Sequence, residues 1–242
     1  MQKVKKNDGD WPQESPELAS FRGPHVAVDI ALFTVVSGEF TKDYRLAFLL
    51  HTRQDGLAKG EWALPGRMVR ERERLDDAVQ IALSEKCGIQ GIKPRQLFVF
   101  DEPTRDERGW VMSVAFATTQ SEEVLNEVLE NNPTLAFGFV DDRKTLTLEL
   151  PDDQKTLPFE QDEIVKLGVA SLRRRYTSRP DPDHLLGTTF TLYQLRKIHE
   201  AIEGKELDKD LFRRRMESKL IPTETRSSGS LGKPAQLFRR KK

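Results

Sequence analysis

Residues 63–89, ALPGRMVRERERLDDAVQIALSEKCGI, contain the pattern that decides the fold. The second half of this stretch predicts an amphipathic helix, because its apolar residues recur at the spacing of a single buried stripe. They are Leu75, Ala78, Val79, Ala82 and Leu83. Gly88 follows directly, where glycine commonly ends a helix. The simplest interpretation is a helix that packs one face into a core.

The same stretch also keeps the spacing of a known motif. It resembles the Nudix box, G-x5-E-x7-R-E-U-x-E-E-x-G-U, in which U is apolar. With Gly88 and Ile89 as anchors, Arg67 takes the position of the first glycine and Glu73 that of the first glutamate. The preceding segment 62–66, WALPG, resembles the W-x-L-P-G lead-in of that family. An unrelated amphipathic helix does not explain this lead-in, so we favour a Nudix domain over a chance match.

The catalytic positions of the box have changed. Its R-E pair falls on Ile81 and Ala82, and its E-E pair on Glu85 and Lys86. Positions 82, 85 and 86 share one helix face, where the family places three glutamates on Mg²⁺, a cation that needs oxygen ligands. Here the face offers a methyl group, one carboxylate and an ammonium that repels the ion. We therefore expect no catalytic residue, no metal site and no cofactor, and predict that the chain is not an enzyme.

Composition and charge divide the chain of 242 residues in two. Residues 1–158 carry 20 Lys and Arg against 27 Asp and Glu, a balance of −7, whereas residues 159–242 carry 19 against 12, a balance of +7. Such asymmetry indicates two units with different partners, and the basic unit is the candidate for a polyanion. The single cysteine, Cys87, excludes an intramolecular disulfide and a cysteine-rich metal site. No apolar stretch reaches transmembrane length, so we expect a cytoplasmic protein without membrane contact.

The first part of the chain predicts strands mixed with a central helix. Ser121 is expected to cap a second, short helix at 122–131. This order is compatible with the α/β/α sandwich of the Nudix family. The expected strands are 25–36, 45–52, 96–101, 110–118, 135–140 and 145–150.

The second part predicts a winged helix-turn-helix. After a helix at 161–176, Thr191 is the expected N-cap of a helix at 192–202, and a tight turn leads to a further helix at 208–219. Two extended pieces with a Gly/Ser-rich tip then form the wing. We expect three regions: a flexible tail at 1–20, a degenerate Nudix domain at 21–155 and a DNA-binding domain at 156–242.

The helix at 208–219 has the composition of a DNA-recognition helix. Phe212 and Met216 mark its buried side, whereas Arg213 and Arg214 point away from the core, as phosphate-binding or groove-reading residues must. An ion pair between Arg214 and Asp210 is the alternative role for that arginine. The basic wing favours DNA. The DNA-binding candidates are Thr191, Lys209, Arg213, Arg214, Arg215, Arg226, Lys233 and Arg239.

Both halves together resemble the Nudix-related transcriptional regulators, the NrtR family. The resemblance covers about residues 25–240 and is carried by FTLYQLRKIHEAIEGKELDKDLFRRR at 190–215, GKPAQLFR at 232–239 and RDERGW at 105–110, which is similar to the family's R-D-x-R-G-W. It implies a bacterial homodimeric repressor of NAD biosynthesis or salvage genes. In this family ADP-ribose or a related NAD-derived metabolite binds the Nudix domain, changes the spacing of the DNA-binding helices and releases the operator.

Three positions depart from the family pattern. Leu211 stands where asparagine is usual, Phe238 replaces a tyrosine, and Arg67 replaces a glycine beside the expected diphosphate. The operator sequence and the effector therefore follow less directly from the resemblance than the architecture does.

Candidate effector contacts lie around the box and the RDERGW segment. Arg105, Asp106 and Arg108 are proposed because guanidinium groups bind a diphosphate bidentately; the alternative is a structural Arg–Asp pair. A tryptophan can stack on a base or ribose, or pack in the core. His199 is expected at the surface. The full set of candidates is Trp62, Arg67, Glu73, Glu85, Arg105, Asp106, Arg108 and Trp110.

Two alternatives remain open. The chain is a pyrophosphatase on ADP-ribose or a nucleotide sugar if Asp76, Asp77 or Glu71 supplies substitute metal ligands beside Glu73 and Glu85. It is a regulator of the same family with a different effector if the pocket takes a sugar such as arabinose.

Overall fold

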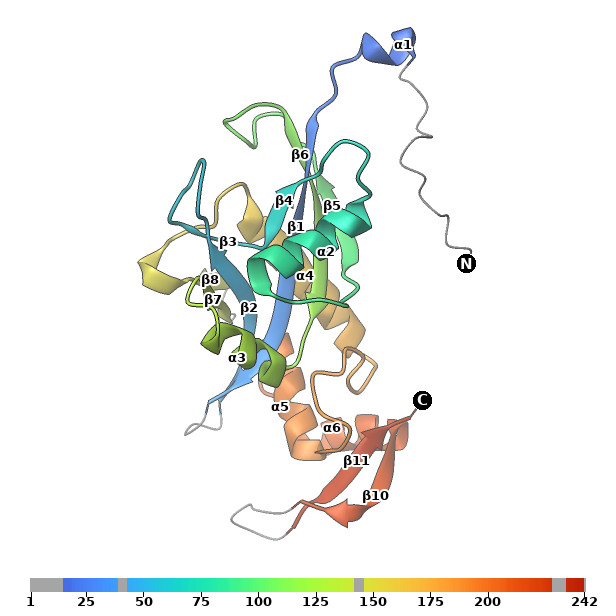
Figure 1. Cartoon of the computed structure of the whole chain (residues 1–242). Coiled ribbons are helices and arrows are strands. Elements are labelled where there is room, and N and C mark those ends of the chain that lie inside the picture. The colour runs from blue at the N-terminus through green and yellow to red at the C-terminus, as the bar shows by residue number, and fades with distance from the viewer. Residues whose placement is uncertain (1–14, 39–42, 142–145, 228–233, 242) are drawn as a thin grey trace.

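A large mixed sheet covered by helices forms one end of the molecule, and a small winged unit forms the other (Figure 1). The computed structural model describes residues 15–38, 43–141, 146–227 and 234–241. The large sheet has the strand order β5-β6-β1-β2-β7-β8, with β3 on β2 and β4 on β1. Strands β1 and β6 run parallel, and the other pairs are antiparallel. The bounds are β1 His25–Ser37, β2 Tyr44–Thr52, β3 Trp62–Ala63, β4 Gly66–Met68, β5 Arg95–Phe100, β6 Val111–Thr119, β7 Leu135–Asp141 and β8 Thr147–Glu149.

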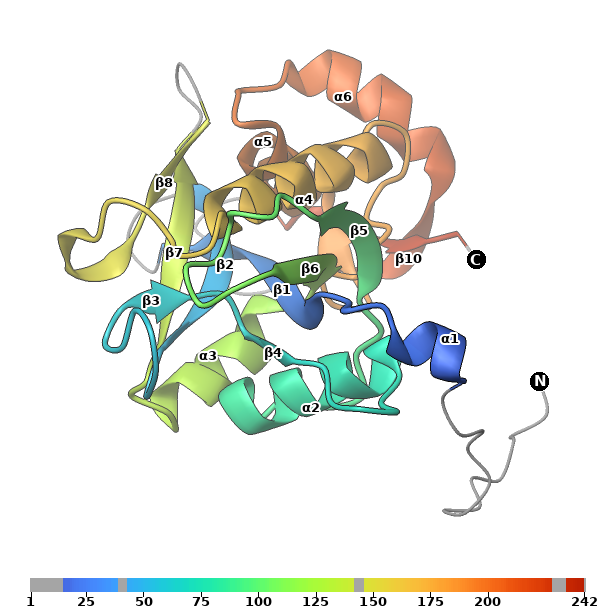
Figure 2. The ribbon, with the colours of Figure 1, turned by 90° about the horizontal axis from the view of Figure 1, so that it is seen from above.

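The central strand β1 is buried on both faces, and its side chains divide between two cores. Val28, Ile30 and Leu32 pack toward α2 (Leu75–Cys87) and α3 (Glu122–Glu130). Ala31 and Phe33 point the other way, toward α4 (Gln161–Tyr176). This alternation follows from the two-residue period of a strand. The predicted α/β/α sandwich is confirmed, and Figure 2 shows α2 and α3 on one side of the sheet and α4 on the other.

Most predicted elements agree with the structure to within two residues at each end. The exceptions are elements too short to show a repeating pattern of apolar residues. They include the two-residue strands, the single turn α1 (Pro16–Ala19) in the predicted tail, and the 3-10 turns η1 (Pro151–Asp153) and η2 (Glu217–Lys219). The predicted helix at 208–219 is divided into α6 (Lys209–Met216) and η2. None of the helices in the described ranges is both long and apolar enough to cross a membrane.

The winged unit contains its own small core. It comprises β9 (Phe190–Thr191), α5 (Leu192–Glu203), α6, β10 (Leu220–Arg226) and β11 (Gln236–Arg240), with sheet order β10-β11-β9. Thr191 begins α5 through a capping box with Gln194, which satisfies two backbone donors at the helix start. Gly204 ends α5 in the left-handed conformation, with φ of 72°. The core residues are Phe190, Leu195, Phe212, Met216, Leu220 and Phe238.

Helix α4 contacts both units. Its residues Ile164, Val165 and Val169 pack in the core of the large sheet, where Gly168 lies so close to Phe33 that an added Cβ would be 2.6 Å from the ring. At its other end α4 contacts the winged unit, because the ring of Tyr176 packs edge-on against His199 of α5 and its hydroxyl donates to Asp181. The expected domain boundary at 155/156 assigns α4 to the DNA-binding half alone, whereas its apolar face covers the sheet.

The junction between the units is built around Asp181 and His199. The carboxylate of Asp181 accepts hydrogen bonds from the Tyr176 hydroxyl (2.8 Å), from the backbone of Leu185 and Leu186 (both 3.0 Å) and from Arg240 of β11 (2.5 Å). A helix end, a loop and a wing strand are therefore joined at one buried group.

The expectation that His199 lies at the surface is wrong, because it is fully buried in this junction. Its ring contacts Tyr176 and Phe212 edge-on, with centroids 5.1 and 5.0 Å away, and Nε2 donates to the Pro180 carbonyl at 2.5 Å. Nδ1 has no partner in the described part of the chain. Helical periodicity alone did not reveal this because two separate elements cover the ring.

Burial of His199 predicts a pH-dependent stability. Desolvation lowers the pKa of His199 from 6.5 to about 4. Between these values the unfolded histidine binds a proton and the folded one does not, so the free energy of unfolding falls as the pH drops from 6.5 to 4. Denaturant unfolding should show that His199→Gln, which retains a donor for Pro180, reduces this slope by up to one proton. The exposed His184→Gln serves as the control; an equal slope in wild type and His199→Gln contradicts the assignment.

Candidate effector pocket and DNA-binding face

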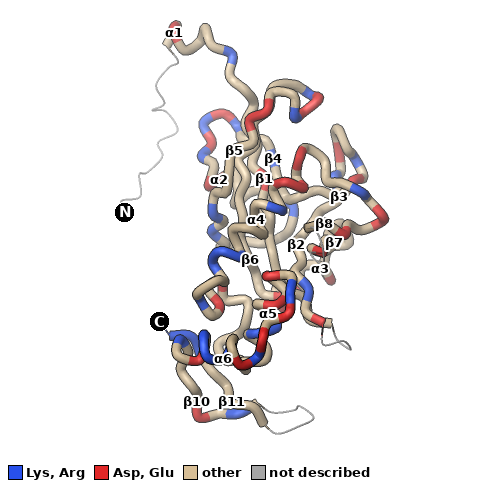
Figure 3. The backbone as a smooth tube through the Cα atoms, turned by 180° about the vertical axis from the view of Figure 1, so that it is seen from behind, with Lys and Arg blue, Asp and Glu red and all other residues tan. Residues whose placement is uncertain are grey.

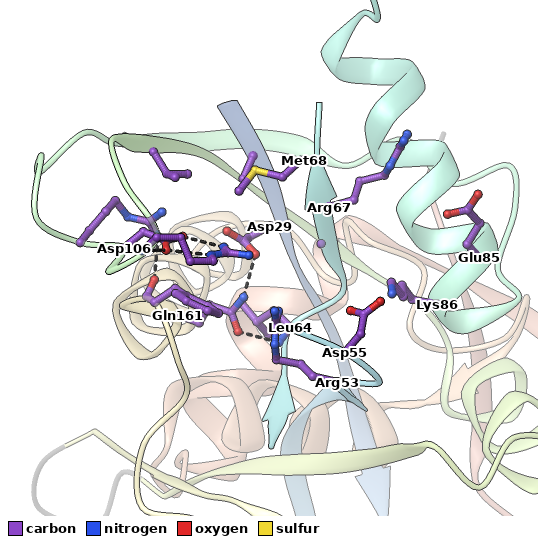
Figure 4. A pocket seen from close by; sticks show the side chains of 16 residues that line it. Asp29, Arg53, Asp55, Leu64, Arg67, Met68, Glu85, Lys86, Asp106 and Gln161 are labelled. Atoms are coloured by element: carbon purple, nitrogen blue, oxygen red, sulfur yellow. Dashed lines mark hydrogen bonds and ion pairs between the residues drawn. The ribbon is translucent and has the colours of Figure 1, made fainter. Parts of the chain in front are cut away.

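A polar pocket opens beside the degenerate box, between the loop after β2, β4, the end of α2, the loop before β6 and the start of α4 (Figure 4). Five of the predicted effector residues line it: Arg67, Glu85, Arg105, Asp106 and Arg108. They come from segments far apart in the chain. The sheet and α2 thus bring the box and the RDERGW segment to one cavity.

Three predicted effector residues lie outside this lining. Trp62 is half-buried, and its Nε1 donates to Asp152 at 2.8 Å. Trp110 is 50% exposed, so it is not the core tryptophan considered above. Glu73 accepts hydrogen bonds from the Arg70 backbone (2.8 Å) and from the Arg67 guanidinium (2.6 Å), and these contacts hold the pKa of Glu73 below its usual value.

The residues present do not fit the Mg²⁺ that the Nudix fold implies. Glu73 is engaged by Arg67, and Ala82 is a fully buried methyl group in the core. Glu85 and Lys86 both line the pocket, so an ammonium stands beside the remaining carboxylate. Across the described ranges, His, Cys, Asp and Glu form no group of three or more that could hold a metal.

Buried polar residues that the sequence analysis missed form the floor of the pocket. Asp29 on β1 accepts hydrogen bonds from Gln161 Nε2 (2.7 Å) and the Ser113 hydroxyl (2.5 Å). Burial raises the pKa of this carboxyl, although the two hydrogen bonds and Arg105 and Arg53 act against that shift. A lone aspartate in the apolar run HVAVDIALF was the available signal. Gln161 also accepts from the Leu64 backbone at 2.8 Å, which ties the start of α4 to the floor.

Three arginines, Arg53, Arg105 and Arg108, line the pocket. Arg108 and Asp106 form the structural Arg–Asp pair considered above, with contacts of 2.6 and 2.9 Å. Arg105 is 1% exposed and pairs with Glu160 instead. Arg53, from the loop after β2, has a pKa below its usual value because it is partly buried and faces Arg108. Three guanidinium groups in one pocket, two of which repel each other, are suited to an anionic ligand.

The exposed side of α6 carries the predicted DNA-binding residues. Lys209, Arg213, Arg214 and Arg215 are exposed, whereas Phe212 and Met216 are buried. Arg213 pairs with Glu217 at 2.9 Å, and Arg214 Nε donates to the Asp210 carbonyl oxygen at 3.4 Å, not to its carboxylate. Figure 3 shows Lys and Arg in blue around α6 and near the C-terminus, at the end of β11.

The remaining DNA-binding candidates occupy different surroundings. Thr191 is half-buried, and its hydroxyl accepts from the Gln194 backbone, so its capping role is clear. Arg226 is exposed at the end of β10. Arg239 lines a separate basic groove with Arg179 and Lys219, at the opposite end of the wing strands. Lys233 lies outside the described residues.

Comparisons with known proteins agree with both halves of this architecture. Residues 182–240 match the model of the NrtR DNA-binding winged helix domain. The ADPR responsive transcriptional repressor NtrR of Acinetobacter baylyi is 30% identical over 228 residues, which cover 92% of this chain and 84% of that protein. A structure of Shewanella oneidensis NrtR with a 27mer DNA superposes with a TM-score of 0.71 and 27% identity, and covers 89% of this chain and 93% of that one.

A further relative matches the Nudix part alone. The ADP-ribose pyrophosphatase of Methanocaldococcus jannaschii is 33% identical over 124 residues, covering 47% of this chain and 68% of that enzyme. A domain that resembles an enzyme is thus joined to a winged helix. The chain belongs to the NrtR family of Nudix-related transcriptional regulators.

Proposed function

We propose that this chain is a DNA-binding repressor whose affinity for its operator is controlled by ADP-ribose or a related NAD-derived metabolite. The observation that carries the proposal is the connection between its two sites: α4 begins at the floor of the arginine-lined pocket and ends at the junction with the winged unit. The name of the relative from Acinetobacter baylyi states both transcriptional repression and a response to ADPR.

The chemistry of the pocket suits such an effector. Arg53, Arg105 and Arg108 can bind a diphosphate through charge-assisted hydrogen bonds. Carboxylates such as Asp29 and Asp55 can accept hydrogen bonds from ribose hydroxyl groups. A neutral sugar such as arabinose would leave the guanidinium cluster without an anion, so this alternative is the weaker one.

The family architecture supports further proposals about assembly and context. The protein acts as a homodimer on a double-stranded operator in the cytoplasm and controls genes of NAD biosynthesis or salvage. The effector-binding unit begins after residue 20. Its boundary with the DNA-binding unit falls near the end of α4, because the apolar face of that helix packs on the sheet and Tyr176 at its end contacts Asp181 and His199.

Fluorescence anisotropy on DNA from upstream of the gene and its neighbours tests the main proposal. We expect tight, salt-sensitive binding, because phosphate contacts release counterions, and we expect ADP-ribose to weaken it. AMP and arabinose are the matched effector controls. Binding that ADP-ribose leaves unchanged contradicts the proposed effector, and an absence of binding contradicts the repressor.

The chain is further proposed to lack hydrolase activity. Ile81, Ala82 and Lys86 stand where the box requires an Arg-Glu pair and a glutamate, and Glu73 is engaged by Arg67. We expect no AMP release from ADP-ribose with Mg²⁺ at high protein concentration. The likeness to a pyrophosphatase keeps the enzyme as the second candidate. Mg²⁺-dependent turnover that is lost in Glu85→Gln would establish it.

A further inference from the structure

The two residues that precede α4, Phe159 and Glu160, contact the guanidinium groups that line the pocket. The Phe159 carbonyl accepts a hydrogen bond from Arg105 Nη2 at 2.6 Å, and the Glu160 carboxylate accepts one from Arg105 Nε at 3.1 Å. These two bonds use two of the five N–H donors of Arg105, whose side chain is 1% exposed. The segment therefore provides the same type of acceptor oxygen that an anionic ligand would provide.

The Phe159 ring engages the other two arginines. The guanidinium carbons of Arg53 and Arg108 each lie 4.9 Å from the centroid of this ring. Cation–π attraction of this kind weakly compensates for the repulsion between the two like charges. All three arginines of the cluster are thus in contact with a segment of two residues.

The backbone of Phe159 and Glu160 adopts an unfavourable conformation. Phe159 has φ of 57° and Glu160 has φ of 58°, in the left-handed region that residues other than glycine rarely adopt. Such positions persist only when their surroundings hold them. Here the contacts with Arg53, Arg105 and Arg108 are available to hold them.

We propose that Phe159 and Glu160 couple effector binding to α4. The diphosphate of the effector replaces these two residues as the partner of Arg53, Arg105 and Arg108. The start of α4 is then no longer held by the three arginines. This inference rests on the proposed function. A diphosphate carries more anionic oxygens than the segment and matches guanidinium groups bidentately. It therefore satisfies the three arginines better than one carbonyl, one carboxylate and one ring.

Helix α4 transmits the displacement of Phe159 and Glu160 to the DNA-binding unit. The next residue, Gln161, joins the helix to Asp29 and Leu64 at the pocket floor. Fifteen residues later Tyr176 donates to Asp181, which also binds Arg240 of the wing. A shift at the first turn of α4 is thus passed to β11 by one rigid helix and one buried carboxylate.

Glu160→Gln and Phe159→Ala test the proposal separately, with calorimetry for ADP-ribose and anisotropy for the operator. Glu160→Gln removes the competing charge, so ADP-ribose should bind about two- to fivefold more tightly, the range for an ion pair that solvent screens, because the Glu160 side chain is 41% exposed. Phe159→Ala removes the ring, so without effector its operator affinity should fall toward the value that wild type shows with saturating ADP-ribose. Glu163→Gln, whose side chain pairs with Lys166, is the matched control and should resemble wild type.

The outcomes separate a failure of the proposed function from a failure of the role given to Phe159 and Glu160. If wild type fails to bind ADP-ribose or the operator, the proposed function fails and the inference fails with it. If wild type responds to ADP-ribose but Glu160→Gln binds it no more tightly, the proposed function stands and the role of the segment is wrong. An unchanged operator affinity in folded Phe159→Ala overturns the transmission through α4.

Discussion

Replacement of Arg213 and Arg214 by alanine together is expected to weaken operator binding by about a hundredfold or more while ADP-ribose binding stays unchanged. Each contact to a base or phosphate contributes about 1–3 kcal/mol, and both guanidinium groups lie on the exposed side of α6. The ion pair between Arg213 and Glu217 must be given up on binding, but exposed pairs of this kind contribute little. Anisotropy and calorimetry give the two affinities.

The matched control for this variant is Arg72→Ala with Arg74→Ala. It removes the same two charges from exposed positions in the Nudix half. A similar loss of operator affinity in both variants would indicate a general effect of net charge. Wild-type affinity in the α6 variant would show that α6 is not the recognition helix.

Asp181→Ala is expected to lower the free energy of unfolding by about 3–5 kcal/mol, the range for removal of one partner of a buried ion pair. The Asp181 side chain is fully buried and accepts from four donors. Its loss leaves the Arg240 guanidinium, 16% exposed, without its carboxylate. Denaturant titration followed by circular dichroism measures the change.

A second substitution separates the lost charge pairing from lost packing. Arg240→Met in the Asp181→Ala background removes the unpaired charge, so the double variant should recover part of the stability. If Asp181→Ala costs less than about 1 kcal/mol, a typical single hydrogen bond, then Asp181 does not join the units as described.

The sequence predicted the regular elements because they carry their own periodicity. The apolar stripe of α2, the run of β1 and the capping box at Thr191 are local signals. The packing of α4 was not predictable in the same way. Its spacing shows that one face is buried but not that the partner is a sheet whose central strand, β1, lies more than a hundred residues earlier in the chain.

The site was predicted in part for a similar reason. Motif positions such as Arg67, Arg105 and Arg108 reached the pocket because they belong to patterns with fixed spacing. Asp29, Arg53 and Phe159 belong to no motif and meet only after folding. Their roles depend on neighbours that a single sequence does not place together.

The contacts that α4 makes with both units limit how the DNA-binding unit can be transplanted. A fusion that begins at residue 182, where the match to the winged helix model starts, would omit Tyr176 and uncover one side of His199. A fusion that begins at Gln161 would keep the junction but expose Ile164, Val165 and Val169 to water. A new sensor for this winged helix therefore needs a sheet surface that accepts the same helix. Simple end-to-end fusion of this winged helix to another domain would therefore fail.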